Sequence, residues 1–142
     1  MSAYSVEPAV EHAELRAALY ELVGRFLRDY ERAAAAHGLT LTQARVLGFA
    51  ACEPLSQRQL AARFGCDPSN ISVIVDRLAE RELVERRPDP RDGRVKLVAA
   101  TPAGSALAER CCREREWLGP ALDRLDPDQR ERVREALELL LR

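Results

Sequence analysis

The sequence predicts a mainly α-helical fold with one small β-hairpin, and three observations carry that prediction. Two short amphipathic helical patterns lie between residues 56 and 80, separated by a very short turn. A charged segment containing Pro88, Pro90 and Gly93 follows at once, between two short β-capable stretches. Helical patterns flank this region on both sides. That order of elements is typical of a winged helix-turn-helix with additional N- and C-terminal helices.

The first short helix has clear start and stop signals. Ser56 can cap the backbone amides while Gln59 reaches back, which is a capping box. Leu60 and Phe64 then contribute to a buried face. Gly65 ends the helix because glycine adopts a positive φ without steric cost.

The second short helix starts with Asp67 as N-cap and Pro68 at its first position. Its apolar stripe, at spacing i, i+3, i+4 and i+7, consists of Ile71, Ile74, Val75 and Leu78. The opposite side carries Ser69, Val73, Asp76 and Glu80, flanked by Asn70, Ser72 and Arg77. Small polar residues let a helix lie deep in a major groove and hydrogen-bond base edges or phosphates. Val73 on this side fits a thymine methyl, or it is a single exposed valine of the kind any surface has.

The hairpin between Val84 and Ala99 has a net positive tip. Its cations are Arg86, Arg87, Arg91, Arg94 and Lys96, against the two acids Asp89 and Asp92. Arginines suit a narrow minor groove, where the negative potential is strongest. A charged loop is often only solvated, but its position directly behind a helix-turn-helix favours a DNA contact.

Residues 60–65, 71–78 and 83–94, together with Thr101, resemble the MarR family of bacterial transcriptional regulators. The specific part is the Asp92-x-Arg94 signature with a threonine seven residues later. The resemblance implies a homodimer, DNA binding through the winged helix, and release by a phenolic or other aromatic ligand or by thiol oxidation. Two positions depart from the family pattern. Glu82 stands where a glycine usually caps the helix in a left-handed conformation, and Gly93 stands where a basic residue is common.

Length and charge agree with a small regulator. The chain of 142 residues is long enough for one domain with a real core. Its net charge of −1 does not exclude DNA binding, because the local field of the hairpin governs phosphate contact. With no apolar run at the N-terminus or of membrane-spanning length, we expect a cytoplasmic protein whose four cysteines are reduced thiols.

The segments on both sides of the winged helix-turn-helix are predicted to be helices with a structural role. Residues 10–36 form one long helical pattern, and Thr40 with Gln43 is a second capping box. Thr101-Pro102 starts a helix expected to reach about Trp117, and Asp126-Pro127 with Gln129 opens the last one. These helices carry more apolar surface than one winged helix can cover, so a second copy is expected, with two-fold symmetry suited to palindromic DNA. The expected organisation is a single MarR-like domain over residues 1–142, with dimerisation helices at 10–38 and 101–142 and the winged helix-turn-helix at 40–100.

The sequence contains few residues that indicate a metal, cofactor, catalytic or redox site. His12 and His37 have no partners at ligand spacing, so no metal is expected, and no cofactor or catalytic constellation is recognisable. Cys66 lies at a helix N-terminus, which favours thiolate, while Cys111 and Cys112 are adjacent and cannot readily pair with each other. These three are weak redox candidates, and the alternative for each is an inert thiol.

The resulting prediction is a homodimeric, non-enzymatic DNA-binding regulator, expected to be a repressor. Its candidate DNA-binding residues are Pro68, Ser69, Asn70, Ser72, Val73, Arg77, Arg86, Arg87, Arg91, Arg94 and Lys96. Arg94 is the first candidate for a minor-groove contact and Arg91 the second; for the basic residues an internal pair with Asp76 or Asp92 is the rival role. The resemblance alone places an effector pocket near Tyr20, Phe26, Phe49 and Trp117. The alternative function is a protein-interaction scaffold without DNA binding, which the acidic Asp76 and Glu80 favour slightly.

Overall fold

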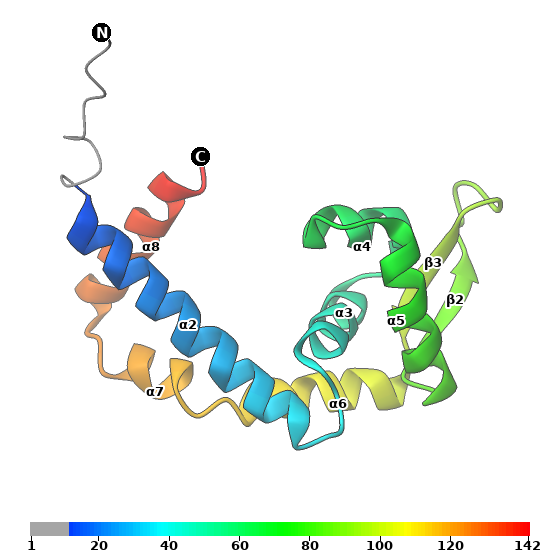
Figure 1. Cartoon of the computed structure of the whole chain (residues 1–142), viewed down its shortest axis with the longest axis horizontal. Helices are drawn as coiled ribbons and strands as arrows, with labels where there is room; N and C mark the ends of the chain where they lie inside the picture. Colours follow the sequence, from blue (N-terminus) through cyan, green and yellow to red (C-terminus); the bar gives the residue numbers. More distant parts are fainter. Residues whose placement is uncertain (1–11) are drawn as a thin grey trace, which may run out of the picture. The chain divides into compact units, whose positions relative to one another are not determined.

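The structure, a computed structural model, describes residues 12–142 and contains the predicted winged helix-turn-helix (Figure 1). Its elements are α2 (Ala13–Ala35), α3 (Leu41–Cys52), β1 (Leu55–Ser56), α4 (Gln57–Phe64), α5 (Pro68–Glu80), β2 (Val84–Pro88), β3 (Lys96–Ala100), α6 (Pro102–Arg113), α7 (Leu118–Asp123) and α8 (Pro127–Leu140). The chain forms two compact units. The winged-helix unit is Tyr30–Arg115, and the terminal unit runs up to Asp29 and from Glu116 to Arg142.

The sheet of the winged-helix unit has three antiparallel strands in the order β1-β3-β2. β2 and β3 form the predicted hairpin, with Val84 opposite Ala100 and Pro88 opposite Lys96. The two-residue strand β1 was not predicted; Leu55 pairs with Val98 on the other edge of β3. Two residues carry too little alternation to signal a strand, so only the tertiary pairing identifies it. In Figure 1 the hairpin lies beside α5.

The core of the winged-helix unit is aliphatic. Its largest fully buried side chains are Leu47, Leu60, Ile71, Leu78, Val46, Val75 and Val98. They come from α3, α4, α5 and β3, so the short helices of the helix-turn-helix are fixed by burial against α3 and the sheet rather than by their own length. Ile74 is only half-buried, and the buried stripe of α5 is therefore narrower than predicted.

The predicted helix caps are mostly present. Thr40, Ser56 and Asp126 each form a capping box with the glutamine three residues on. Asp67 is different: it occupies the N-cap position of α5, but its side chain makes no capping hydrogen bond. The predicted N-cap position of Asp67 is therefore confirmed, and the rigid φ of Pro68 is the local signal that favours the helix start.

Three helices end with the same pair of backbone hydrogen bonds, which characterises the Schellman motif. Gly38 and Gly65 have the left-handed φ that this motif needs, 69° and 62°. At the end of α5 the same place is held by Glu82 with φ 57°, and its amide and that of Leu83 donate to Ala79 and Leu78. Glu82 thus accepts the strain instead of changing the way the helix ends.

The helix after Thr101 is shorter than predicted. It ends at Arg113, and α7 follows as a separate short helix. Within the terminal unit, the carboxylate of Asp29 accepts hydrogen bonds from the amides of Glu116 and Trp117 at 3.0 and 3.1 Å. An uninterrupted helix would use those amides for its own carbonyls, so the tertiary contact takes the place of another helical turn. Pro120 further disfavours a continuous helix.

Candidate functional site

The exposed face of α5 presents the residues that the sequence predicts. Ser69 and Asn70 are exposed, Ser72 is half-buried, and Val73 keeps 54% of its surface in solvent. Ile71, Val75 and Leu78 on the other side are buried. Because Val73 is the one aliphatic side chain on an otherwise polar first half of this face, it stays available for an apolar partner such as a thymine methyl.

The tip of the hairpin, residues 89–95, is shaped by two aspartates. Asp89 accepts a hydrogen bond from the amide of Arg91 at 2.9 Å, and Asp92 accepts one from the amide of Arg94 at 3.1 Å. These are Asx turns, in which a carboxylate completes the backbone turn locally. The amide of Asp89 also donates to the carbonyl of Val95 at 2.8 Å, closing the loop.

Arg94 extends from this tip into solvent. Its side chain is 95% exposed, and its Nε lies 3.6 Å from Asp92 Oδ1. Asp92 Oδ1 also accepts the amide of Arg94, so the ion pair at 3.6 Å is the longer of its two contacts with this residue. A long, exposed and loosely held guanidinium can move to a phosphate or into a narrow groove.

The basic residues of the surface fall into two groups. Arg86 Nη2 lies 2.6 Å from Asp76 Oδ1, and Arg87 Nη2 lies 2.5 Å from Glu85 Oε1. The side chains in the second group form no ion pair within residues 12–142; they are Arg77, Arg91 and Lys96. The rival role of an internal pair therefore applies to Arg86 through Asp76 and, at 3.6 Å, to Arg94 through Asp92. It also applies to Arg87, whose partner is Glu85 instead of either of these two acids.

Thr101 connects the end of α5 to the start of α6, a role that sequence reasoning missed. Its hydroxyl donates to the carbonyl of Glu82 at 2.6 Å and accepts from the amide of Gly104 at 3.0 Å. Its own amide donates to Leu83 at 3.0 Å. The threonine of the sequence signature thus supports the base of the wing. The signal was its fixed spacing from Arg94, but spacing alone did not indicate which groups it binds.

Arg81 is a second supporting residue for which the sequence held no signal. From the C-terminus of α5, its guanidinium donates to the carbonyls of His37 and Gly38 at 3.0 and 3.2 Å. His37 in turn places Nε2 2.7 Å from Glu114 Oε2. His37 thus has a carboxylate partner. No cluster of three metal-ligating side chains exists among residues 12–142.

The four aromatic residues of the predicted effector pocket are divided between the two units. Tyr20, Phe26 and Trp117 belong to the terminal unit, where Tyr20 is 72% exposed. Phe49 belongs to the winged-helix unit and packs edge-on against Phe64, with ring centroids 5.7 Å apart. Neither unit by itself brings all four rings together.

The cysteines are free thiols in different environments. Cys111 is buried and its neighbour Cys112 is exposed, as expected for successive helical positions; Cys66 is half-buried and Cys52 exposed. Burial raises the pKa of the Cys111 thiol, which makes thiolate scarcer there and reduces its reactivity. In the part of the chain that the structure covers, no helix is both long and apolar enough to span a bilayer.

Comparisons with known proteins agree with this geometry. The family model described as the MarR family matches residues 37–95. An uncharacterised HTH-type transcriptional regulator of Mycobacterium leprae is 36% identical over 83 residues, covering 58% of this chain and 58% of the relative. The HTH-type transcriptional repressor NicR of Pseudomonas putida is 43% identical over 56 residues, 39% of this chain and 35% of that one. This chain thus aligns with little more than half the length of the mycobacterial relative.

Solved structures extend the likeness over most of the chain. CouR of Rhodococcus jostii, solved with p-coumaroyl-CoA bound, has a TM-score of 0.71 and 33% identity, covering 86% of this chain and 87% of its own. The apo form of MarR from Escherichia coli has a TM-score of 0.71 at 23% identity, over 90% and 97%, which supports the fold. These relatives are regulators rather than enzymes, as the sequence predicted. The chain belongs to the MarR family of transcriptional regulators.

Proposed function

We propose that this protein is a homodimeric, sequence-specific DNA-binding regulator that represses transcription from a palindromic operator. The observation that carries the proposal is the exposed polar face of α5 lying beside a wing whose Arg94 is 95% exposed. A helix with small polar residues suits the major groove, and an arginine-tipped hairpin suits the minor groove or backbone next to it. Repression is favoured because NicR, which is 43% identical over 56 residues, is named a repressor.

Base reading is assigned to α5 and backbone contact to the wing. The α5 residues are Pro68, Ser69, Asn70, Ser72 and Val73, with Arg77 near the phosphates. Wing candidates are Arg91, Arg94 and Lys96. Arg86 and Arg87 are further candidates, whose charges are neutralised by Asp76 and Glu85 in their present ion pairs.

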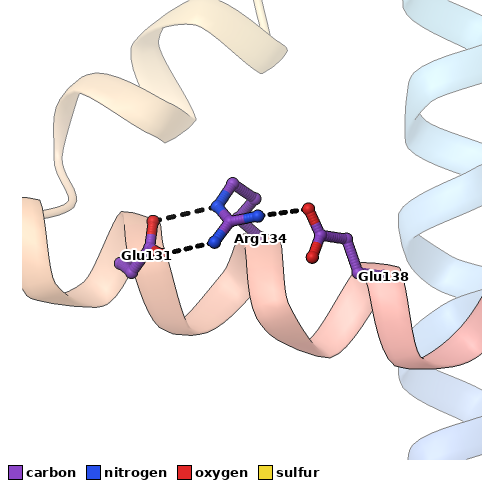
Figure 2. Close-up of polar contacts among 3 residues, drawn as sticks. All are labelled: Glu131, Arg134 and Glu138. Carbon is purple, nitrogen blue, oxygen red and sulfur yellow. Dashed lines mark hydrogen bonds and ion pairs between the residues drawn. The ribbon is translucent and has the colours of Figure 1, made fainter.

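The dimer is supported by apolar surface on the terminal helices. α8 has no buried residue, and Val133, Leu137, Leu140 and Leu141 are 41%, 42%, 56% and 85% exposed. They recur at spacing i, i+4, i+7 and i+8, which makes one helical stripe. Charged residues occupy another face: Figure 2 shows Arg134 between Glu131, at 2.5 Å, and Glu138. An amphipathic helix with its apolar stripe in solvent is best explained by a second copy.

We assign dimerisation to residues 10–38 and 101–142 and DNA binding to residues 40–100, as one MarR-like domain. On a palindromic site the two α5 helices of the dimer would enter two successive major grooves, one helix from each subunit.

The proposed effector is a small aromatic compound, because CouR was solved with p-coumaroyl-CoA. Such a ligand would favour a dimer geometry that does not fit the operator, and linkage requires operator DNA to weaken ligand binding by the same factor. Oxidation of Cys66, Cys111 or Cys112 is the competing mode of release. Cys111 is the weakest of these three candidates, because its thiol is buried and burial raises its pKa.

The test is to select duplexes from a random pool with the purified protein and to titrate binding against salt. Specific, salt-dependent binding to a palindromic sequence supports the proposal; a protein-interaction scaffold would bind no duplex in a salt-dependent manner. Addition of aromatic acids and p-coumaroyl-CoA, and separately of mild peroxide, then identifies the mode of release. Serine substitution at each of the three cysteines identifies the thiol if peroxide alone acts.

A further inference from the structure

Asp76 and Arg86 form an ion pair that connects the recognition helix to the wing. Asp76 lies on the exposed face of α5, three residues after Val73. Arg86 follows the buried Val84 by two residues and therefore lies on the same side of β2. Arg86 Nη2 is 2.6 Å from Asp76 Oδ1, and the two side chains are 34% and 57% exposed. Such a pair contributes little to folding, because solvent screens it.

The position of this pair in the proposed DNA interface gives it another consequence. A carboxylate on the DNA-facing side of α5 would repel phosphates, and a free Arg86 would attract them. Paired at 2.6 Å, each cancels the charge of the other. While Arg86 is paired with Asp76 it therefore offers a phosphate little net charge, whereas Arg91 and Lys96 have no ion pair within the described residues.

Non-specific affinity depends on available cations more than operator affinity does. Binding to random duplex consists almost entirely of phosphate contacts, and a sliding protein can adjust until any free arginine meets a phosphate. In the operator complex, base contacts fix the register, so a phosphate lies near Arg86 only if that register places one there.

We propose that Asp76 is a specificity-determining residue, which lowers affinity for non-operator DNA by holding Arg86. This inference rests on the proposed function. An acidic residue on the DNA-binding surface would thus set the ratio of operator affinity to random-duplex affinity.

The test compares four variants of the full-length protein by fluorescence anisotropy on random duplex and on the selected operator. Asp76→Asn releases Arg86 while keeping a polar side chain of the same size. Glu80→Gln is the matched control, because it removes the same charge one helical turn on, from an exposed residue without an ion pair among those described. Arg86→Gln and the double variant Asp76→Asn/Arg86→Gln show whether the effect passes through Arg86.

For Asp76→Asn we expect tighter binding to random duplex and a salt slope steeper by about two units, one phosphate for each subunit of a dimer. Between 50 and 200 mM salt the loss of affinity would then grow by about tenfold relative to the unmodified protein. Operator affinity should rise less than random-duplex affinity. Glu80→Gln should change the salt slope little. In the background of Arg86→Gln, adding Asp76→Asn should likewise change the slope little, because no arginine is left to release.

Equal effects of Asp76→Asn and Glu80→Gln would overturn the proposal, because the charge alone would then matter. Weaker DNA binding by Asp76→Asn would also overturn it and would make the pair a support that positions the wing. Failure of the proposed function gives a different result from failure of this inference alone. If the proposed function is wrong, the unmodified protein already shows no salt-dependent binding to any duplex, and this inference is then wrong as well.

Discussion

At the scale of single residues, the cations of the wing differ in whether a carboxylate pairs closely with them. Arg86 and Arg87 have carboxylate partners at 2.6 and 2.5 Å, while Arg94 extends into solvent. A count of charges in the sequence treats them as equal. The difference arises because only some of them lie within reach of an acid on a neighbouring strand or helix.

Arg94→Ala should weaken DNA binding more than Arg91→Ala, because Arg94 belongs to the wing signature and its side chain is 95% exposed at the tip. If Arg94 neutralises one phosphate in each subunit, its loss flattens the salt slope by about two units for the dimer. Ser72→Ala should instead alter the preference among sequences with little change in slope. Salt titrations of the three variants measure both effects. Normal binding by Arg94→Ala together with a lower melting temperature would make Arg94 an internal support of the wing and Arg91 the candidate contact.

Glu82 is the one non-glycine residue with positive φ among residues 12–142, at 57°. Glu82→Gly should stabilise the protein by about 1 kcal/mol, because glycine has no Cβ to crowd the backbone in this conformation. Thermal melting should show a rise of roughly 3 °C for a chain of this size. Glu82→Ala keeps the strain and serves as control, so an equal rise in both variants would show that the side chain, not φ, is the cause.

At the scale of elements, α6 lies so close to the end of α5 that only glycine fits between them. A Cβ built at Gly104 would lie 1.8 Å from the carbonyl oxygen of Leu83. That same carbonyl accepts the amide of Thr101, so it cannot move away without losing a hydrogen bond. The close approach fixes the base of the wing relative to α6.

Gly104→Ala should destabilise the protein by about 3 kcal/mol, since backbone rather than a flexible side chain must shift. Gly93→Ala is the matched substitution: a Cβ there meets nothing within 4 Å, and Gly93 does not have a positive φ. It should change stability by less than about 0.5 kcal/mol. Chemical denaturation of both variants measures the difference, and equal stabilities would contradict the close packing.

At the scale of the whole molecule, the terminal helices leave a large share of their apolar side chains exposed. On α2 these include Leu15, Tyr20 and Val23 at 55%, 72% and 51%. α8 adds its own stripe, without a buried residue of its own. Association is the expected consequence, because hydrophobic stabilisation grows with the apolar area removed from water.

Sedimentation at micromolar concentration should therefore give a stable dimer. Leu137→Glu combined with Val133→Glu should shift the protein toward monomer, because two buried charges would oppose association. Arg134→Ala changes the charged face of the same helix and is the control that should leave the dimer intact (Figure 2). A monomer that binds DNA tightly would contradict this architecture.

The sequence by itself determined the winged helix-turn-helix, its capping boxes at Thr40, Ser56 and Asp126, and the exposed face of α5. These follow from local rules: helical periodicity selects the buried side, and capping hydrogen bonds form between residues three apart. Family resemblance added the expectation that Arg94 and Thr101 matter.

Only the tertiary structure decided the features that depend on distant partners. The Asp76–Arg86 pair joins residues ten apart, and Arg81 binds carbonyls more than forty residues away. Asp29 accepts the amides of residues 116 and 117, which are also distant in the sequence. No local pattern reports which carboxylate meets which guanidinium, because these contacts are fixed by the packing of whole elements. For the same reason the available cations of the wing could be identified only after the fold had placed its acids.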